Sequence, residues 1–389
     1  MLNSPQSIAT MGTFDFSDQE RVVFGTPFVQ AVNAEIERLG VQRVLILTAP
    51  TLADPNGMAT RMLDDVVGAS AWVFSACEPH APITTVLTAA DAARRLDAQL
   101  LVAIGGGSVI DTAKAVQICL WNGIRTVDDF QHFKETGWRT SLQQTHLRVL
   151  AVPTTLAGAE FTKYANISDG AGKRIYSHRS IVPQVVVLDP QVTEQTPAEL
   201  LLSTGFKAID HAVETICSIN GNPLAEATAT HALKLLATGL PSMLLEGVDL
   251  EGRLSCQFGS WLSIMGVGAG VKYGASHGIS YVLGGQFGVP HGYTSCLTLP
   301  AVLRWNYPVN AAKQDMVSQA LGQPMRMPAD ILNDLLCELG MPTRLNEFGI
   351  HEEHLEVIAK AALQENFVKA NPRPFASADE LVDVLRSVL

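Results

Sequence analysis

The chain has 389 residues, a formal charge of −11, 47% hydrophobic residues and only 17% charged residues. At roughly 100 to 200 residues per domain this length suggests two domains with a sizeable core, which excludes a small scaffold that needs disulfides or a metal to fold. The acidic balance gives no electrostatic support for a nucleic-acid or membrane partner, and the composition excludes a disordered chain. We therefore expect a globular protein whose partner is a small molecule. Its apolar composition favours contact between two copies, so we predict a homodimer.

The cysteines and the N-terminus indicate the compartment. The six cysteines are far apart and form no CxxC pair, so neither a zinc knuckle nor a disulfide framework is indicated. The N-terminal segment is polar and acidic, without a basic stretch followed by an apolar core, and we predict no signal peptide and a cytoplasmic protein. Residues 254–271 carry no charge over 18 positions, which approaches the length of a membrane span, but their Gly and Ser content favours a buried helix.

Short apolar runs alternate with helical patterns in the first half of the chain. The runs are rich in Val, Ile and Leu and are bounded by Gly, Pro or Asp, as buried parallel strands are. They are residues 41–48, 100–105, 148–153 and 182–188, and helical spacing occupies segments such as 27–40 and 88–98. Strands that alternate with helices predict a doubly wound α/β domain.

The character of the chain changes after about residue 195. Ala/Leu-rich segments with helical spacing follow, broken by Gly and Pro, and turn residues near Pro197 separate the two regimes. We predict an N-terminal α/β domain with a parallel sheet over residues 1–195 and an all-α C-terminal domain over residues 196–389.

A glycine-rich loop follows the run at 100–105. Glycines at the end of a strand let backbone N–H groups approach a phosphate, and the N-terminus of the next helix favours the anion. The segment matches neither GxGxxG nor GxxxxGK[ST], so the generic dinucleotide and NTPase loops are less favoured, and a turn without a ligand is the alternative. The residues predicted to hold a nucleotide here are Gly105, Gly106, Gly107, Ser108 and Asp111.

A second loop, residues 151–162, also follows a strand. The hydroxyls of Thr154 and Thr155 are suited to bind phosphate or ribose. Because ligands bind beyond the carboxyl ends of the strands in such sheets, we expect both loops on one edge.

Four segments in this order resemble the iron-containing (group III) alcohol dehydrogenase family, which has a dehydroquinate-synthase-like fold. They are GGGSVIDTAKA, PTTLAGAEFT, KAIDHAVE and HGISYVLGGQFGVPHG. The chain is most similar to the maleylacetate reductase branch, through RVVFG followed by VNAEIERLG, the short AGAE form of the second loop, and NPRP near the end. The resemblance covers nearly the whole chain. It implies an N-terminal NAD(P)-binding domain, a helical C-terminal domain and an active site in the cleft between them.

The resemblance also places a metal site and shows where this chain departs from it. Metal-dependent members use an Asp, a His four residues later and two further His, and the corresponding positions here are Lys207, His211, His277 and His291. An ammonium has no lone pair for a metal and repels a divalent cation, so we do not expect metal binding. Asp210 offers a carboxylate, but it precedes His211 by one residue and so projects about 100° away around the helix. We do not expect Asp210 to restore the site.

A second departure is Tyr281, four residues after His277, where the family usually has a His implicated in proton transfer. Tyrosine can donate a proton, but its ordinary pKa of about 10 makes it a different acid. Maleylacetate reductases are understood to work without a metal, so hydride transfer need not be lost. Histidines satisfied in the core and a solvated Lys207 are the structural alternative.

The cofactor preference is open. The strand that ends at Thr48 continues into Ala49 and Pro50, with no carboxylate to reject a 2′-phosphate, so NAD(H) and NADP(H) can both serve. We place Thr48 and Lys173 among the cofactor-binding residues.

The sequence thus predicts a metal-independent, NAD(P)H-dependent oxidoreductase that reduces a small carbonyl or enone acid. Lys207 would supply the charge stabilisation that a metal gives elsewhere. Substrate orientation and proton movement fall to His211, His277, Tyr281 and His291. Three alternatives remain: a metal-dependent alcohol dehydrogenase, a recruited enzyme that catalyses elimination, cyclisation or isomerisation, and a non-catalytic nucleotide-binding protein.

Overall fold

The computed structural model describes residues 16–136, 147–169, 172–245 and 247–389. The chain forms two compact units, one of residues Ser17–Thr196 and one that comprises Pro197–Leu389. We predict no signal peptide in the N-terminal segment, and residues 1–15 of that segment lie outside the described residues.

The first unit is built on a six-stranded parallel sheet with the order β1-β8-β5-β4-β2-β3. Its strands are β1 (Arg21–Phe24), β2 (Arg43–Thr48), β3 (Ser70–Phe74), β4 (Leu100–Gly105), β5 (Arg148–Pro153) and β8 (Val185–Leu188). The helices of this unit are α1 (Phe28–Leu39), α2 (Met58–Asp65), α3 (Ile83–Arg95), α4 (Gly107–Asn122) and α5 (Val127–Thr136).

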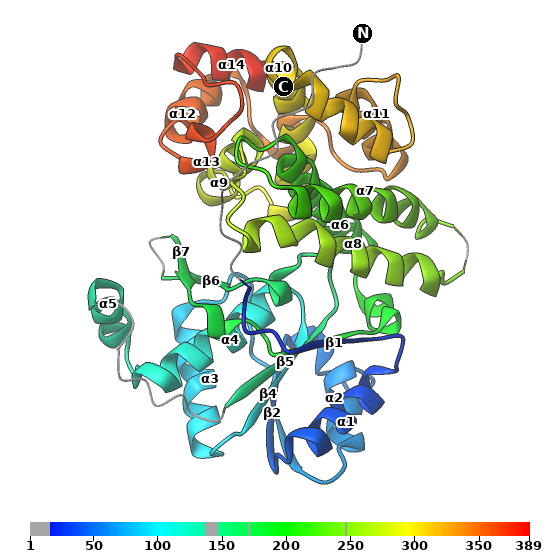
Figure 1. Cartoon of the computed structure of the whole chain (residues 1–389). Coiled ribbons are helices and arrows are strands. Elements are labelled where there is room, and N and C mark those ends of the chain that lie inside the picture. The colour runs from blue at the N-terminus through cyan, green and yellow to red at the C-terminus, as the bar shows by residue number, and fades with distance from the viewer. Residues whose placement is uncertain (1–15, 137–146, 170–171, 246) are drawn as a thin grey trace. The chain divides into compact units, whose positions relative to one another are not determined.

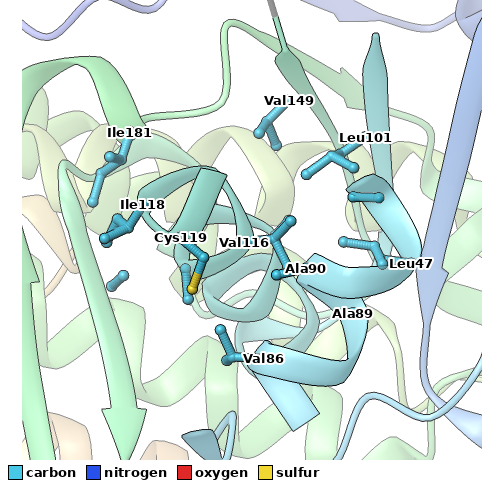
Figure 2. Close-up of a cluster of buried hydrophobic side chains, with 14 of the residues drawn as sticks. Leu47, Val86, Ala89, Ala90, Leu101, Val116, Ile118, Cys119, Val149 and Ile181 are labelled. Carbon is cyan, nitrogen blue, oxygen red and sulfur yellow. The ribbon is translucent and has the colours of Figure 1, made fainter. Parts of the chain in front are cut away.

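The interior positions of the central strands are apolar because helices cover both faces of the sheet. Alternate residues of β2 enter different cores: Leu45 and Leu47 pack with α3 and α4, whereas Val44 and Ile46 pack with α1 and α2. Figure 1 shows these two pairs of helices on opposite sides of the sheet. In Figure 2, Leu47, Leu101 and Val149 of three neighbouring strands meet the helices of one face.

Shorter elements complete the first unit. An antiparallel hairpin joins β6 (Tyr164–Ser168) and β7 (Lys173–Ser177). Short 3-10 helices are η1 (Pro50–Leu52), η2 (Ala159–Phe161), η3 (Arg179–Ile181) and η4 (Pro190–Gln195).

All regular secondary structure in the described residues of the second unit is helical. Its long helices are α6 (Ala198–Cys217), α7 (Pro223–Ser242), α8 (Leu250–Gly268), α9 (Ala275–Gln286) and α10 (His291–Ala320). Shorter ones follow: α11 (Pro328–Glu338), η5 (Leu345–Phe348), α12 (Glu352–Ala362), α13 (Asn366–Lys369) and α14 (Ala378–Arg386). The uncharged segment 254–271 begins inside α8, and within the described residues no helix has the length and hydropathy needed to cross a bilayer.

The structure corrects several predicted boundaries. The strand predicted at 182–188 begins only at Val185, and the helix predicted at 88–98 is α3, which begins earlier, at Ile83. The edge strands β1 and β3 and the hairpin had not been predicted.

Candidate functional site

The glycine loop lies where the connections of the sheet change direction. From β2 the chain moves outward to β3 and then returns across β2 to β4, so the carboxyl ends of β2 and β4 flank a topological switch point. Thr48 is the last residue of β2, Gly105 is the last of β4, and Thr154 follows β5 with its N–H donating to Gly105 O at 3.1 Å. Ligands of open α/β sheets bind at this place.

The glycines are required by close contacts. Gly105 has a φ of +156°, and a Cβ there would lie 2.6 Å from Val109 Cγ2. A Cβ on Gly106 would lie 3.0 Å from Thr155 Cγ2, so the two predicted loops pack directly against each other. Gly106 is also the N-cap of α4 and brings no side chain, which leaves the first N–H groups of the helix open to an anion.

Two predicted hydroxyls are already engaged inside the protein. Thr48 Oγ1 donates to Ile104 O at 2.9 Å, and Ser108 Oγ accepts from His80 N at 2.9 Å. A nucleotide at this loop would therefore be held mainly by backbone N–H groups.

Asp111 belongs to a buried polar network and does not extend the phosphate loop. Its Oδ2 accepts from Asn166 Nδ2 at 3.1 Å, and its Oδ1 is 3.7 Å from Lys114 Nζ. Lys114 is fully buried and donates to Ala159 O at 2.6 Å and to Tyr164 O at 2.7 Å. This lysine therefore ties α4 to the end of the second loop.

Glu160 and Lys173 also belong to the first unit. Burial raises the pKa of Glu160 to about 7, although the charge of Lys114 opposes that shift. Lys173, predicted to bind the cofactor, is the first residue of β7 and pairs with Ser168, and its side chain lies outside the described part of the structure.

The second unit carries a polar stripe along α6. Lys207, Asp210, His211 and Glu214 are all buried, at spacings of three, four and seven residues. These spacings place all four side chains on one face of a helix.

Lys207 is held in a triad. Its Nζ donates to Asp210 Oδ2 at 3.1 Å and to Ser295 Oγ at 2.9 Å, and Ser295 Oγ donates to the same Asp210 oxygen at 2.5 Å. Burial acts to raise the pKa of Asp210, but the charges of His277 and Lys207 outweigh it and lower that pKa. Lys207 is therefore not solvated, and Asp210 is its counter-ion.

His277 is oriented by carboxylates. Its Nδ1 is 2.5 Å from Glu214 Oε2 and 3.4 Å from Asp210 Oδ2. The prediction that Asp210 projects away from the site is wrong, because an angle of about 100° still falls within the buried face of α6. Among the described residues, His277 Nε2 is buried without a hydrogen-bond partner.

His211 stacks on two other rings. Its centroid is 5.2 Å from that of His277 and 5.5 Å from that of Tyr273, and Tyr273 lies 4.1 Å from His277. Burial, followed by the charges of His277, Lys207 and His291, holds the pKa of His211 well below its ordinary value. His211 is therefore a neutral imidazole, and its Nδ1 has no partner in the described chain.

Tyr281 and His291 form a separate pair. Their rings meet edge to face at a centroid distance of 6.4 Å, and His291 is exposed as the first residue of α10. Phe367 connects this pair to the buried cluster, because its ring lies 5.4 Å from Tyr281 and 6.2 Å from His277. The predicted catalytic residues are thus found in one region of the helical unit, at two different depths.

The donor set does not fit a resident metal ion. Lys207 offers no lone pair, and its ammonium is bonded to Asp210. Potential ligand atoms of Asp210, Glu214 and His277 do lie within 4.8 Å of one another. Glu214 is, however, hydrogen-bonded to His277, and Asp210 is paired with Lys207, a fixed cation that opposes a second one.

Sequence reasoning missed Glu214 and Ser295. Glu214 follows Lys207 by seven residues, and this helical spacing was a signal that could have revealed it. Ser295 lies in α10, and nothing in its local sequence connects it to α6.

Comparisons with known proteins identify the family. Residues 201–389 match the model "Fe-containing alcohol dehydrogenase family, C-terminal", and residues 19–190 match "Iron-containing alcohol dehydrogenase". A maleylacetate reductase of Sphingobium indicum is 32% identical over 355 residues, or 91% of each chain. The structure of maleylacetate reductase from Agrobacterium tumefaciens is 25% identical, with a TM-score of 0.83 over 98% of both chains. That of sulfoacetaldehyde reductase from Bifidobacterium kashiwanohense, in complex with NAD+, is 26% identical, with a TM-score of 0.86 over 97% of this chain and 98% of that one.

The chain combines a doubly wound α/β unit, which has a glycine-rich loop suited to bind phosphate, with a helical unit that has a buried polar cluster. These features together are those of an oxidoreductase. The chain belongs to the iron-containing alcohol dehydrogenase family. The predicted family, fold class and enzyme class are confirmed.

Glu160 generates a prediction about pH. Its carboxyl keeps a proton in the folded state up to about pH 7, whereas in the unfolded chain it releases that proton near its ordinary value of 4.5. Between these values the unfolded state binds fewer protons, so stability should fall as pH rises and level off above the window. In Glu160→Gln this pH-dependent contribution is removed. As the pH rises from 4.5 to 7.5, the free energy of unfolding of the variant should therefore increase by about 3 kcal/mol relative to that of wild type.

Urea unfolding of both proteins across this pH range measures the difference. The control is Glu37→Gln in α1, an exposed position in the same unit, where the difference from wild type should hardly change. A constant difference for Glu160→Gln would contradict the prediction.

Proposed function

We propose that the protein is a metal-independent, NAD(P)H-dependent reductase of a small carbonyl or enone acid. The family supports an oxidoreductase, the maleylacetate reductase relatives support the substrate class, and the NAD+ complex of sulfoacetaldehyde reductase supports the cofactor. A small-molecule substrate, a cytoplasmic location and a homodimer belong to the same proposal.

The observation that carries the proposal is the ammonium of Lys207. In the resemblance this position belongs to the metal-binding Asp, and in the structure a buried cation is fixed there by Asp210 and Ser295. Asp210 offsets part of the charge, but it also prevents Lys207 from rotating away. A preorganised donor of this kind stabilises negative charge that develops on a carbonyl oxygen.

The remaining roles follow from the hydrogen bonds. A bound reduced nicotinamide would supply the hydride, to the carbonyl carbon of a carbonyl substrate or to the β-carbon of an enone. In both cases negative charge develops on the carbonyl oxygen, to which Lys207 donates a hydrogen bond. A proton must then reach that oxygen or, in the enone, the α-carbon. His277 Nε2 and His211 Nδ1 are the buried ring nitrogens left to orient substrate, and Tyr281 with the exposed His291 moves protons.

Gly106→Asp tests the cofactor site. The carboxylate would stand at the N-terminus of α4, where the pyrophosphate is expected, and repel it. We expect the dissociation constant for NADH and NADPH, measured by nucleotide fluorescence, to rise about 10- to 100-fold or more.

Gly268→Asp in α8 is the control, because a Cβ at that glycine meets no atom within 4 Å. It should bind nucleotide as wild type does. If Gly106→Asp bound nucleotide as tightly as wild type, the prediction that the cofactor binds at this loop would be wrong.

Metal content tests the second half of the proposal. We expect purified protein to contain far less than one equivalent of iron or zinc, and its oxidation of NAD(P)H with maleylacetate to be unchanged by EDTA. Stoichiometric metal, lost on chelation together with activity and restored by adding iron or zinc back, would establish the metal-dependent alternative.

Lys207→Ala tests the role of the ammonium. Loss of one preorganised donor should lower kcat and kcat/KM together by ~100- to 1,000-fold, or about 3 to 4 kcal/mol, with nucleotide affinity nearly unchanged. A rise of KM alone would instead indicate that Lys207 binds a substrate carboxylate.

Two further variants separate catalysis from folding. Lys207→Ala leaves Asp210 buried without its cation, which is destabilising, whereas Lys207→Ala/Asp210→Asn removes both charges and should be folded but equally slow. Lys207→Asp restores a carboxylate beside Asp210 and Glu214, and we expect it to acquire zinc or iron affinity. A wild-type rate in Lys207→Ala with no metal in Lys207→Asp would place Lys207 outside the site.

A further inference from the structure

The first turn of α9 is capped by a side chain from another helix. Glu214 of α6 accepts from Ser276 N through Oε1 at 3.1 Å and from His277 N through Oε2 at 3.3 Å. The same Oε2 is 2.5 Å from the ring nitrogen Nδ1 of His277. One carboxylate therefore caps the helix and binds the imidazole that this helix carries.

The contact determines which nitrogen of His277 carries a hydrogen. A carboxylate oxygen only accepts, so Nδ1 must be the donor, and the lone pair of a neutral ring is then on Nε2. Asp210 Oδ2 adds an acceptor 3.4 Å from Nδ1, but this oxygen already accepts from Lys207 and Ser295. Glu214 is thus the main partner.

We propose that Glu214 is a positioning residue of the enzyme, which fixes His277 as the Nδ1–H tautomer with Nε2 directed away from the carboxylates. The inference rests on the proposed function only for the task of Nε2, which is to orient the substrate by accepting a hydrogen bond from it. The tautomer itself follows from the contacts within this unit.

A second cap on the same helix shows that the fold does not need a carboxylate for capping alone. Asn371 Oδ1 accepts from Ala275 N at 3.1 Å. The chain approaches both caps closely, since a Cβ on Gly274 would lie 2.9 Å from Asn371 Oδ1 and 3.1 Å from Glu214 Oε1. An amide is thus sufficient as an acceptor for the backbone, and what distinguishes Glu214 is its contact with Nδ1.

Glu214→Gln separates the two tasks. In the orientation that keeps the amide oxygen on Ser276 N, its NH₂ group faces Nδ1, which becomes an acceptor, and the contact with His277 N is lost. We expect His277 to change to the Nε2–H tautomer while the protein remains folded. Loss of a comparable outer partner typically lowers activity by about 10- to 100-fold, and we expect this in kcat, with KM and nucleotide affinity nearly unchanged.

The primary readout is the ring ¹⁵N chemical shifts of histidine-labelled protein, with His277 assigned by the signal missing in His277→Asn. It is independent of turnover. An unchanged tautomer in folded Glu214→Gln would overturn the proposal. A changed tautomer with unaltered kcat would uphold the positioning of the ring and contradict the proposed task of Nε2.

Asn371→Ala is the control for helix capping, and Glu214→Asp is a second variant at the proposed positioning residue. Asn371→Ala removes a cap of the same helix without touching the ring, so it should lower Tm but leave the Nδ1–H tautomer. If Asn371→Ala changed the tautomer as well, the ring would be positioned by the helix and not by Glu214. Should Glu214→Gln fail to fold, Glu214→Asp keeps an acceptor for Nδ1 and should retain the Nδ1–H signal, and its loss there would count against the proposal.

Discussion

The helical unit depends on burying two carboxylates, an ammonium and an imidazole where α6, α9 and α10 meet. Each of these groups alone would be costly in an apolar interior, and the cost falls only when all are paired. Asp210 Oδ2 is the centre of the arrangement, because it accepts from Lys207 and Ser295 and lies 3.4 Å from His277 Nδ1. The three helices are therefore joined by hydrogen bonds to buried charged groups as well as by packing.

The α/β unit uses the same principle for a different purpose. Lys114 is buried next to Asp111 and donates to carbonyl groups at and beyond the end of the second loop. Gly106 allows that loop to approach the first, since any side chain there would meet Thr155. The buried lysine and the absence of a Cβ at Gly106 together hold the two loops in a fixed position relative to each other, which a preorganised phosphate site requires.

Much of this fold follows from patterns within single segments. The strands β4 and β5 are predicted to the residue because both faces are buried and the apolar run has sharp ends. The edge strands β1 and β3 have exposed positions, so they lack such a run and escape notice. The same holds for the site. Lys207 and His277 can be predicted from family motifs. The hydrogen bonds that occupy the hydroxyls of Thr48 and Ser108 cannot, because their partners are distant in sequence.

Asp210 shows why one residue cannot be judged alone. Taken as a metal ligand beside His211 it is misplaced, but taken with Lys207 it completes a pair three residues apart on one helix. At the position that the family pattern gives to Asp, the lysine offers no lone pair to a metal, and the aspartate makes a buried lysine tolerable there. Each substitution without the other leaves an uncompensated buried charge, so the two residues act as one unit. The chemistry of this site is thus decided by the charge balance of a helix face, which no single motif position records.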